Sequence, residues 1–162
     1  MHRKSIIIFF SFFLLATNHI DRSEYLKNIS RYSKLIDRYS AQYNVDPLLV
    51  EAMIAKESSG VPDVAGIDAN KKGWSYGLMQ VKYSTAYGLG FRGSLSKLRE
   101  PATNIKYGTK YIAQCIEWAK NDWRLALDYY NRGIGQAIKH PYSGKWEDHP
   151  YVGFVIEYMY GD

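Results

Sequence analysis

Apolar side chains recur every three or four residues along the chain, and this period restricts the fold more than any other feature of the sequence. In the first such run, Leu26, Ile29, Tyr32, Ile36 and Tyr39 follow one another at these spacings. They form one face of an amphipathic helix. No segment shows a convincing alternation of period two, which a half-buried strand would give. The sequence therefore predicts a mainly α fold.

Capping residues and glycines divide the helical pattern into elements. Asp46-Pro47 supplies an N-cap residue followed by proline at the first helical position, and Asp122 is a second N-cap candidate. Clusters of glycine and proline mark loops over 60–75 and from about 133 to 144. The predicted helices cover residues 23–43, 47 to about 60, 77–87, 101 to about 119, 122–131 and the segment from 150 onward.

The chain length fits one domain. It has 162 residues, and single domains commonly hold roughly 100–200. Apolar residues make up 46% of the chain, which is too many for a disordered protein. There is no internal repeat, low-complexity tract or linker, so we expect a single domain over residues 21–162.

The first 20 residues have the pattern of a secretory signal peptide. Positive charges at residues 2–4 precede an apolar stretch over 6–16, which is shorter than the roughly 20 residues that cross a bilayer. We therefore expect export to the periplasm or the outside of the cell, without a stable membrane span. An uncleaved anchor stays open, because Leu14-Leu15-Ala16 is not a small-x-small cleavage site. The lone Cys115 sits on an apolar helix face, where packing is expected rather than catalysis.

Charge and composition limit the partners. The formal net charge of +5 suits several polyanions, but no nucleic-acid-binding signature or dense basic cluster is present, so no nucleic acid is expected. The four histidines at 2, 19, 140 and 149 lack metal-ligand spacing, and neither a metal nor another cofactor is predicted. No long apolar heptad marks an oligomer, so we expect a monomer. Fifteen tyrosines, six phenylalanines and four tryptophans are compatible with sugar stacking or with an aromatic core.

Glu57 is the first candidate for chemistry. It lies in the last turn of an apolar helix, in Ile54-Ala55-Lys56-Glu57-Ser58. Partial burial and the negative end of the helix dipole both disfavour its charged form and raise its pKa. A carboxylic acid that stays protonated near neutral pH can protonate the leaving oxygen of a glycosidic bond. Taken alone, a solvated surface glutamate is the other interpretation.

Two further segments carry candidate ligand-binding residues. In Ser75-Tyr76-Gly77-Leu78-Met79-Gln80, Gly77 permits close approach by a ligand or by the Glu57 helix, and Gln80 can hold a sugar hydroxyl or acetamido group. Tyr130-Asn131 precedes a glycine-rich bend and can line a cleft. The alternatives are structural: a turn before a short buried helix, and Asn131 as a helix C-cap.

The order of these motifs resembles a known family. Glu57-Ser58, Gly77-Leu78-Met79-Gln80 and Tyr130-Asn131-x-Gly133 together are similar to the soluble lytic transglycosylase domain of the lysozyme-like superfamily. The resemblance covers roughly residues 35–160 and extends to segments 46–49, 85–86 and 101–111. One departure is Lys82-Tyr83, where the family often carries Met-Pro.

The resemblance implies a lysozyme-like single domain with a substrate cleft between helices and peptidoglycan glycan strands as substrate. Glu57 would be the catalytic acid and base, and a 1,6-anhydromuramic end would be the product. Tyr130 would place its hydroxyl close to Glu57. The residues implied to bind substrate or to support Glu57 are Ser58, Ser75, Gly77, Met79, Gln80, Tyr130 and Asn131.

Two alternatives remain open at this stage. A lysozyme-type hydrolase on the same fold would need a second carboxylate or a positioned water, and Asp63 and Asp68 are its candidates. A non-catalytic wall-binding part of a secretion, pilus or phage apparatus belongs to another class, and intact Glu57, Gln80 and Tyr130 count against it. Enzymatic activity and a role in such an envelope-spanning assembly can also coexist.

Overall fold

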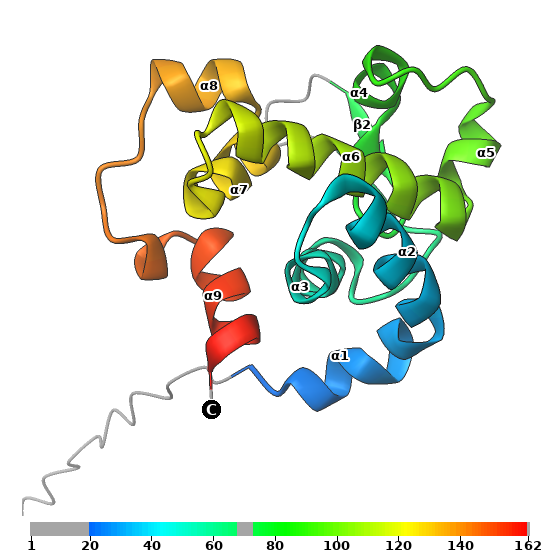
Figure 1. Cartoon of the computed structure of the whole chain (residues 1–162), viewed down its shortest axis with the longest axis horizontal. Coiled ribbons are helices and arrows are strands. Elements are labelled where there is room, and N and C mark those ends of the chain that lie inside the picture. Colours follow the sequence, from blue (N-terminus) through cyan, green and yellow to red (C-terminus); the bar gives the residue numbers. More distant parts are fainter. Residues whose placement is uncertain (1–19, 68–72, 162) are drawn as a thin grey trace, which may run out of the picture.

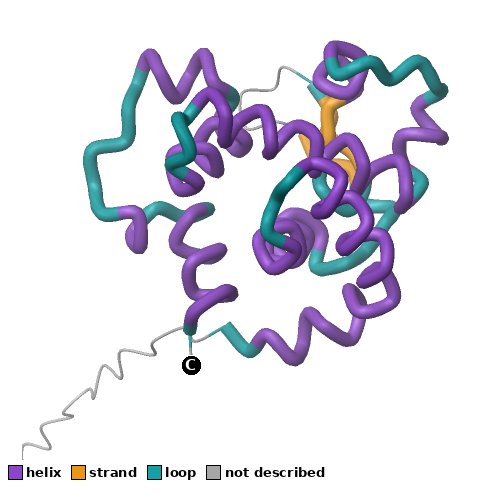
Figure 2. Tube along the Cα trace, in the orientation of Figure 1, coloured by secondary structure: helices purple, strands orange, loops and turns teal. Residues whose placement is uncertain are grey.

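The chain folds mainly into helices, as predicted (Figures 1 and 2). The structure, a computed structural model, describes residues 20–67 and 73–161. The α-helices of this part are α1 (Arg22–Ile29), α2 (Ser33–Tyr43), α3 (Pro47–Ser58), α4 (Tyr83–Gly88), α5 (Leu95–Arg99), α6 (Pro101–Trp118), α7 (Trp123–Arg132), α8 (Ile134–Lys139) and α9 (Val152–Tyr160). Short 3-10 helices cover η1 (Ser30–Tyr32) and η2 (Trp146–Asp148), and the strands are β1 (Ala65–Ile67), β2 (Trp74–Tyr76) and β3 (Val81–Lys82).

Helix α3 runs through the middle of the molecule. The Asp46 side chain accepts a hydrogen bond from the Leu48 N–H at 2.8 Å and begins the helix, and Ser59 ends it in a left-handed conformation. Its side chains are apolar on nearly all sides, which is typical of a fully buried helix. Helices α1, α2 and α9 pack against it, and Figure 1 shows them around α3. The last turn of this buried helix carries Glu57.

Helix α6 is the second structural axis. Helices α2 and α7 pack along it, and its buried face includes Ile105, Gly108 and Ile112. A Cβ atom on Gly108 would lie 2.4 Å from the Met79 sulfur, so only glycine lets this part of the chain approach α6 so closely. The buried apolar residues of all these elements form one continuous core.

The region between α3 and α5 differs from the prediction. Residues 60–75 were expected to be a loop and 77–87 a helix, but β1, β2 and β3 form an antiparallel sheet and α4 begins only at Tyr83. Strands of two or three residues are too short to show an alternating pattern in the sequence. The turn over 77–80 joins β2 to β3, with Tyr76 opposite Val81.

The long helix predicted over 23–43 is also wrong, because η1 interrupts it. Ile29, Tyr32, Ile36 and Tyr39 are nevertheless all buried. A 3-10 turn changes the helix direction while side chains three or four residues apart stay on one side. The spacing of three and four residues therefore predicted the buried face correctly, but it did not predict that η1 interrupts the helix.

The predicted signal peptide lies, apart from Ile20, outside the described residues. Within the described part of the chain, no helix combines the length and apolar character that crossing a bilayer needs.

Candidate active site

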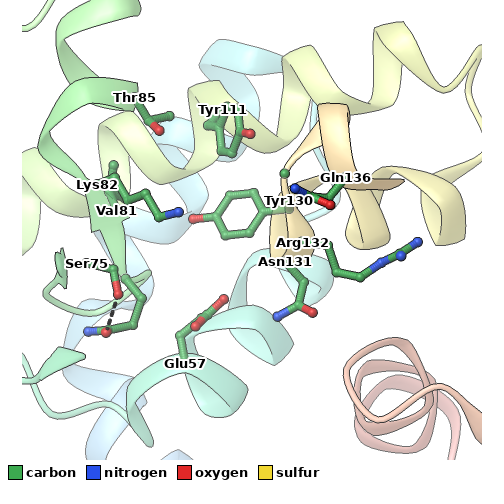
Figure 3. A pocket seen from close by; sticks show the side chains of 12 residues that line it. Glu57, Ser75, Val81, Lys82, Thr85, Tyr111, Tyr130, Asn131, Arg132 and Gln136 are labelled. Atoms are coloured by element: carbon green, nitrogen blue, oxygen red, sulfur yellow. Dashed lines mark hydrogen bonds between the residues drawn. The ribbon is translucent and has the colours of Figure 1, made fainter. Parts of the chain in front are cut away.

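A pocket of about 420 Å³ lies between the end of α3, the β2–β3 region and α7 (Figure 3). Its walls are mostly polar and aromatic, a composition suited to sugar hydroxyls and sugar ring faces. The lining residues are Glu57, Ser75, Gln80, Val81, Lys82, Thr85, Tyr111, Tyr130, Asn131, Arg132, Gly133 and Gln136.

Glu57 is partly buried at the edge of this pocket. The Tyr151 hydroxyl, at the N-terminus of α9, donates a hydrogen bond of 2.7 Å to its Oε1. Burial raises the pKa of the Glu57 carboxyl to about 7, and the Tyr151 hydrogen bond and the Lys56 charge oppose this rise. The direction agrees with the prediction from the sequence, and burial is its main cause. Among the described residues that line the pocket, no other side chain carries a carboxylate.

The turn over 77–80 is held by Asn104, a fully buried residue of α6. The Asn104 Oδ1 accepts the Met79 N–H at 2.8 Å, and its Nδ2 donates to the Tyr76 carbonyl at 2.7 Å. Gly77 has φ +77°, and a Cβ atom there would lie 2.5 Å from the Asn104 Nδ2. Gly77 is therefore required by its contact with Asn104, not by approach of a ligand or of α3 as predicted, and it does not line the pocket.

Gln80 and Ser75 face the pocket together. The Ser75 hydroxyl donates to the Gln80 Oε1 at 2.8 Å (Figure 3), and the Gln80 Nε2 donates to the carbonyls of Val64 and Gly77, both at 3.0 Å. Protein groups thus fix the orientation of this amide. The Gln80 Oε1 keeps one acceptor position for a ligand.

Two of the predicted substrate-binding side chains lie in the interior instead. The Ser58 hydroxyl donates to the Leu78 carbonyl at 2.9 Å, and the Met79 side chain is fully buried against Gly108. Neither side chain lines the pocket. Each stabilises the turn that presents Gln80.

Tyr130 lines the pocket together with Glu57, near which it was predicted to lie, and its hydroxyl bonds to the turn over 77–80. Its hydroxyl donates to the Met79 carbonyl at 2.7 Å, and its ring lies 5.0 Å from that of Tyr111. Burial, with the nearby Glu57 charge, raises the Tyr130 pKa well above the usual value. The hydroxyl therefore stays a neutral donor that ties α7 to the turn, while the exposed Asn131 lines the same wall (Figure 3).

Tyr151 was not predicted as a site residue, although its spacing from other apolar residues indicates that it faces inward. Tyr151, Val155 and Tyr158 follow each other at spacings of four and three and are all buried, so the inward face of the last helix includes Tyr151. Lys82 had been noted only as a departure from the resemblance, but its side chain lines the pocket. The other lining residues that were not predicted are Val81, Thr85, Tyr111, Arg132, Gly133 and Gln136.

Of the two candidates for a second carboxylate, Asp63 is described by the structure and is not placed at Glu57. The Asp63 side chain is 84% exposed and lies 3.5 Å from the Arg99 guanidinium, and it does not line the pocket. Asp68 lies outside the described residues. Within 20–67 and 73–161, no group of three His, Cys, Asp or Glu side chains is placed to hold a metal ion.

Comparison with solved structures identifies the fold. The chain is similar to a lytic transglycosylase of Pseudomonas aeruginosa, with a TM-score of 0.69, 20% identity and coverage of 83% of this chain and 24% of that one. It is also similar to the 70-kDa soluble lytic transglycosylase of Escherichia coli, with a TM-score of 0.63, 23% identity and coverage of 78% and 23%. The lysozyme-like fold class is thereby confirmed.

Sequence comparison identifies the family. The chain is 35% identical over 95 residues to an endo-type membrane-bound lytic murein transglycosylase A of Klebsiella pneumoniae and 34% identical to one of Salmonella paratyphi B. Both alignments cover 54% of this chain, which spans 44% of each relative's length. The family model described as the transglycosylase SLT domain matches residues 34–149. This chain therefore belongs to the transglycosylase SLT domain family.

Proposed function

We propose that this protein is a lytic transglycosylase that cleaves the β-1,4 bond between N-acetylmuramic acid and N-acetylglucosamine in peptidoglycan. One observation carries the proposal: Glu57 is the single carboxylate among the described pocket residues, and burial raises its pKa to about 7. The family and the names of its members support the substrate class. The site of action is then the bacterial cell wall, in the periplasm or outside the cell.

In the first step Glu57 acts as the acid. With a pKa of about 7 it is largely protonated below neutral pH, and it transfers this proton to the oxygen that links the two sugars. The bond from that oxygen to the muramic C1 breaks, and the N-acetylglucosamine side leaves as an alcohol. The acetamido group of the muramic residue stabilises the positive C1, the role that a second carboxylate has in most glycosidases.

In the second step Glu57 acts as the base. Its carboxylate removes the proton of the muramic C6 hydroxyl, and the C6 oxygen bonds to C1. The Tyr151 hydroxyl, 2.7 Å from the Glu57 Oε1, stabilises the carboxylate between the two steps. Glu57 ends protonated again, and no water is consumed.

The lysozyme-type alternative has less support. Water attack commonly relies on a second carboxylate about 5–10 Å from the first, and Asp63 points into solvent beside Arg99. With Asp63 set aside, hydrolysis on this fold would depend on Asp68, which lies outside the described residues, or on a water held by uncharged groups such as Gln80 or Asn131.

The test is mass spectrometry of the muropeptides released from purified peptidoglycan by the protein and by its Glu57→Gln variant. We expect anhydromuramic products from the first and a loss of at least about 1,000-fold in rate from the second. Reducing-end products would contradict transglycosylation and favour the hydrolase. No release by a folded wild-type protein would contradict enzymatic activity and favour a wall-binding component.

A further inference from the structure

A buried charge cluster lies behind the wall that carries Tyr151. Asp128, on α7, is fully buried, and both its oxygens accept hydrogen bonds from the Arg132 guanidinium. The His149 Nε2 lies 3.3 Å from the Asp128 Oδ1. Arg132 also donates to the His140 carbonyl at 2.8 Å. A buried carboxylate is stable only when partners of this kind surround it.

The other nitrogen of His149 caps helix α9. The Nδ1 atom accepts the backbone N–H groups of Tyr151 and Val152, both at 3.2 Å. These N–H groups are at the start of α9, where a helix has no carbonyl partners of its own. Because Nδ1 accepts twice, it carries no proton, and the proton of the neutral ring is on Nε2, facing Asp128.

The ring of His149 has little freedom to leave this position. Only 6% of the residue is exposed. The Tyr142 ring meets the imidazole edge-on at 4.8 Å, and the Trp146 ring lies 6.0 Å away. The two residues that follow, Pro150 and Tyr151, lead directly to the hydroxyl that donates to Glu57.

We propose that the Asp128–His149 pair is a positioning element that holds the Tyr151 hydroxyl on the Glu57 carboxyl. Asp128 orients the imidazole, the imidazole fixes the N–H groups at the start of α9, and the start of α9 places Tyr151. His149 thus acts on the site through Tyr151 and touches no reacting atom. Its effect on catalysis rests on the proposed function, whereas its effect on Glu57 does not.

The groups that face His149 agree with a neutral ring. Asp128 and Arg132 face it from α7, Tyr142 and Trp146 from the segment before it, and Tyr151 follows it. Burial lowers the His149 pKa, the Arg132 charge lowers it further, and Asp128 opposes both. A proton on Nδ1 would break both hydrogen bonds to α9. The Asp128–His149 pair therefore stops holding Tyr151 on Glu57 only at acidic pH.

The test follows the Glu57 carboxyl by carbon-13 NMR in His149→Ala, in Tyr151→Phe and in the double variant. The Tyr151 hydroxyl favours the charged carboxylate, so its loss raises the Glu57 pKa, by about half a unit or more. We expect His149→Ala to raise it similarly and the double variant to rise no further. Tyr158→Phe is the control, because it removes a 3.1 Å hydrogen bond from α9 to Glu51 without touching Glu57.

A wild-type Glu57 pKa in folded His149→Ala, or a rise that adds in full to that of Tyr151→Phe, would overturn the proposal. If His149→Ala does not fold, His149→Leu replaces it, because leucine fills part of the space of the ring but accepts no hydrogen bond from the N–H groups of Tyr151 and Val152. The same rise is expected, and a wild-type value would again overturn the proposal. Raised pKa values without anhydromuramic products would support the positioning element and contradict only the proposed function.

Discussion

The two walls of the pocket are held in place by different chemistry. On the wall formed by α3 and the turn 77–80, uncharged buried side chains, above all Asn104, bond to backbone groups. Behind the wall formed by α7, which packs against α9, the charged Arg132 and the titratable His149 bond to backbone groups, and both are partners of the buried Asp128. The first wall has no buried group that titrates near neutral pH except Glu57 itself. The contacts that hold the first wall are therefore expected to be independent of pH, whereas those that hold the second wall are expected to change with pH.

Two tyrosine hydroxyls join the walls. Tyr130 on α7 donates to the Met79 carbonyl, and Tyr151 before α9 donates to Glu57, both at 2.7 Å. The environment of Glu57 therefore depends on both walls.

The largest effect is expected from Arg132→Met, which leaves the buried Asp128 without its cation. We expect a loss of about 3–5 kcal/mol in the free energy of unfolding near pH 8. The loss should be smaller near pH 5, because the Arg132 charge lowers the His149 pKa, and without it His149 takes up a proton more readily beside Asp128. Urea unfolding at both pH values measures this, with Arg124→Met, whose guanidinium only lies over the Trp123 ring, as control. Equal losses at both pH values would contradict a pH-sensitive wall.

Gly77→Ala tests the opposite wall. The added methyl would lie 2.5 Å from the Asn104 Nδ2 in a left-handed conformation, so we expect a loss of about 2–4 kcal/mol. Unlike the loss in Arg132→Met, it should not change with pH. Gly135→Ala is the matched control, since it is helical and its Cβ would meet no atom within 4 Å. A pH-dependent loss in Gly77→Ala would break the distinction between the walls.

Glu57→Gln is expected to stabilise the protein at alkaline pH. The wild-type carboxyl has a folded pKa of about 7 against 4.5 when unperturbed. Its contribution to stability is fully present below the lower value and is lost as pH rises through about 7. Glutamine does not titrate, so the variant should gain on the order of 2 kcal/mol near pH 8 and almost nothing near pH 4. Thermal unfolding at the two pH values measures the gain, and a pH-independent difference would contradict it.

The smallest effect is expected from Tyr130→Phe. It removes the hydrogen bond to the Met79 carbonyl and leaves that buried carbonyl unpaired, at a cost of about 1–2 kcal/mol. Because Tyr130 does not bond to Glu57, the Glu57 pKa should change much less than in Tyr151→Phe. A larger pKa change in Tyr130→Phe would show that Tyr130, and not Tyr151, controls the carboxyl.

Helices α3 and α7 were predictable because their signals are local, whereas α8 lies in the segment that was predicted to be a loop. Asp46-Pro47 and Asp122 cap α3 and α7 where they were expected to, with side-chain oxygens that accept the first free N–H groups. The small sheet and the break at η1 were not predictable in this way. Both depend on contacts with distant segments, such as the hydrogen bond from Asn28 to the Ser59 carbonyl at 3.2 Å.

In the candidate site, too, the residues that belong to local motifs were predictable and those that depend on distant contacts were not. Glu57 and Gln80 reach the pocket from motifs that are short in sequence, and the sequence points to both. Tyr151 is 94 residues from Glu57 along the chain, and only the fold brings them together. Ser58 and Met79 were predicted to contact Glu57 or the substrate, but their side chains lie in the core, because a motif names residues without saying which way each side chain faces.

The most direct test of the account is the pKa of Glu57 in the wild-type protein, followed by carbon-13 NMR of its carboxyl and assigned with Glu57→Gln. We expect a value of about 7, since burial outweighs the Tyr151 hydrogen bond. A value near the unperturbed 4.5 would mean that the carboxyl is ionised at neutral pH. It would contradict the claim that this one residue serves first as acid and then as base.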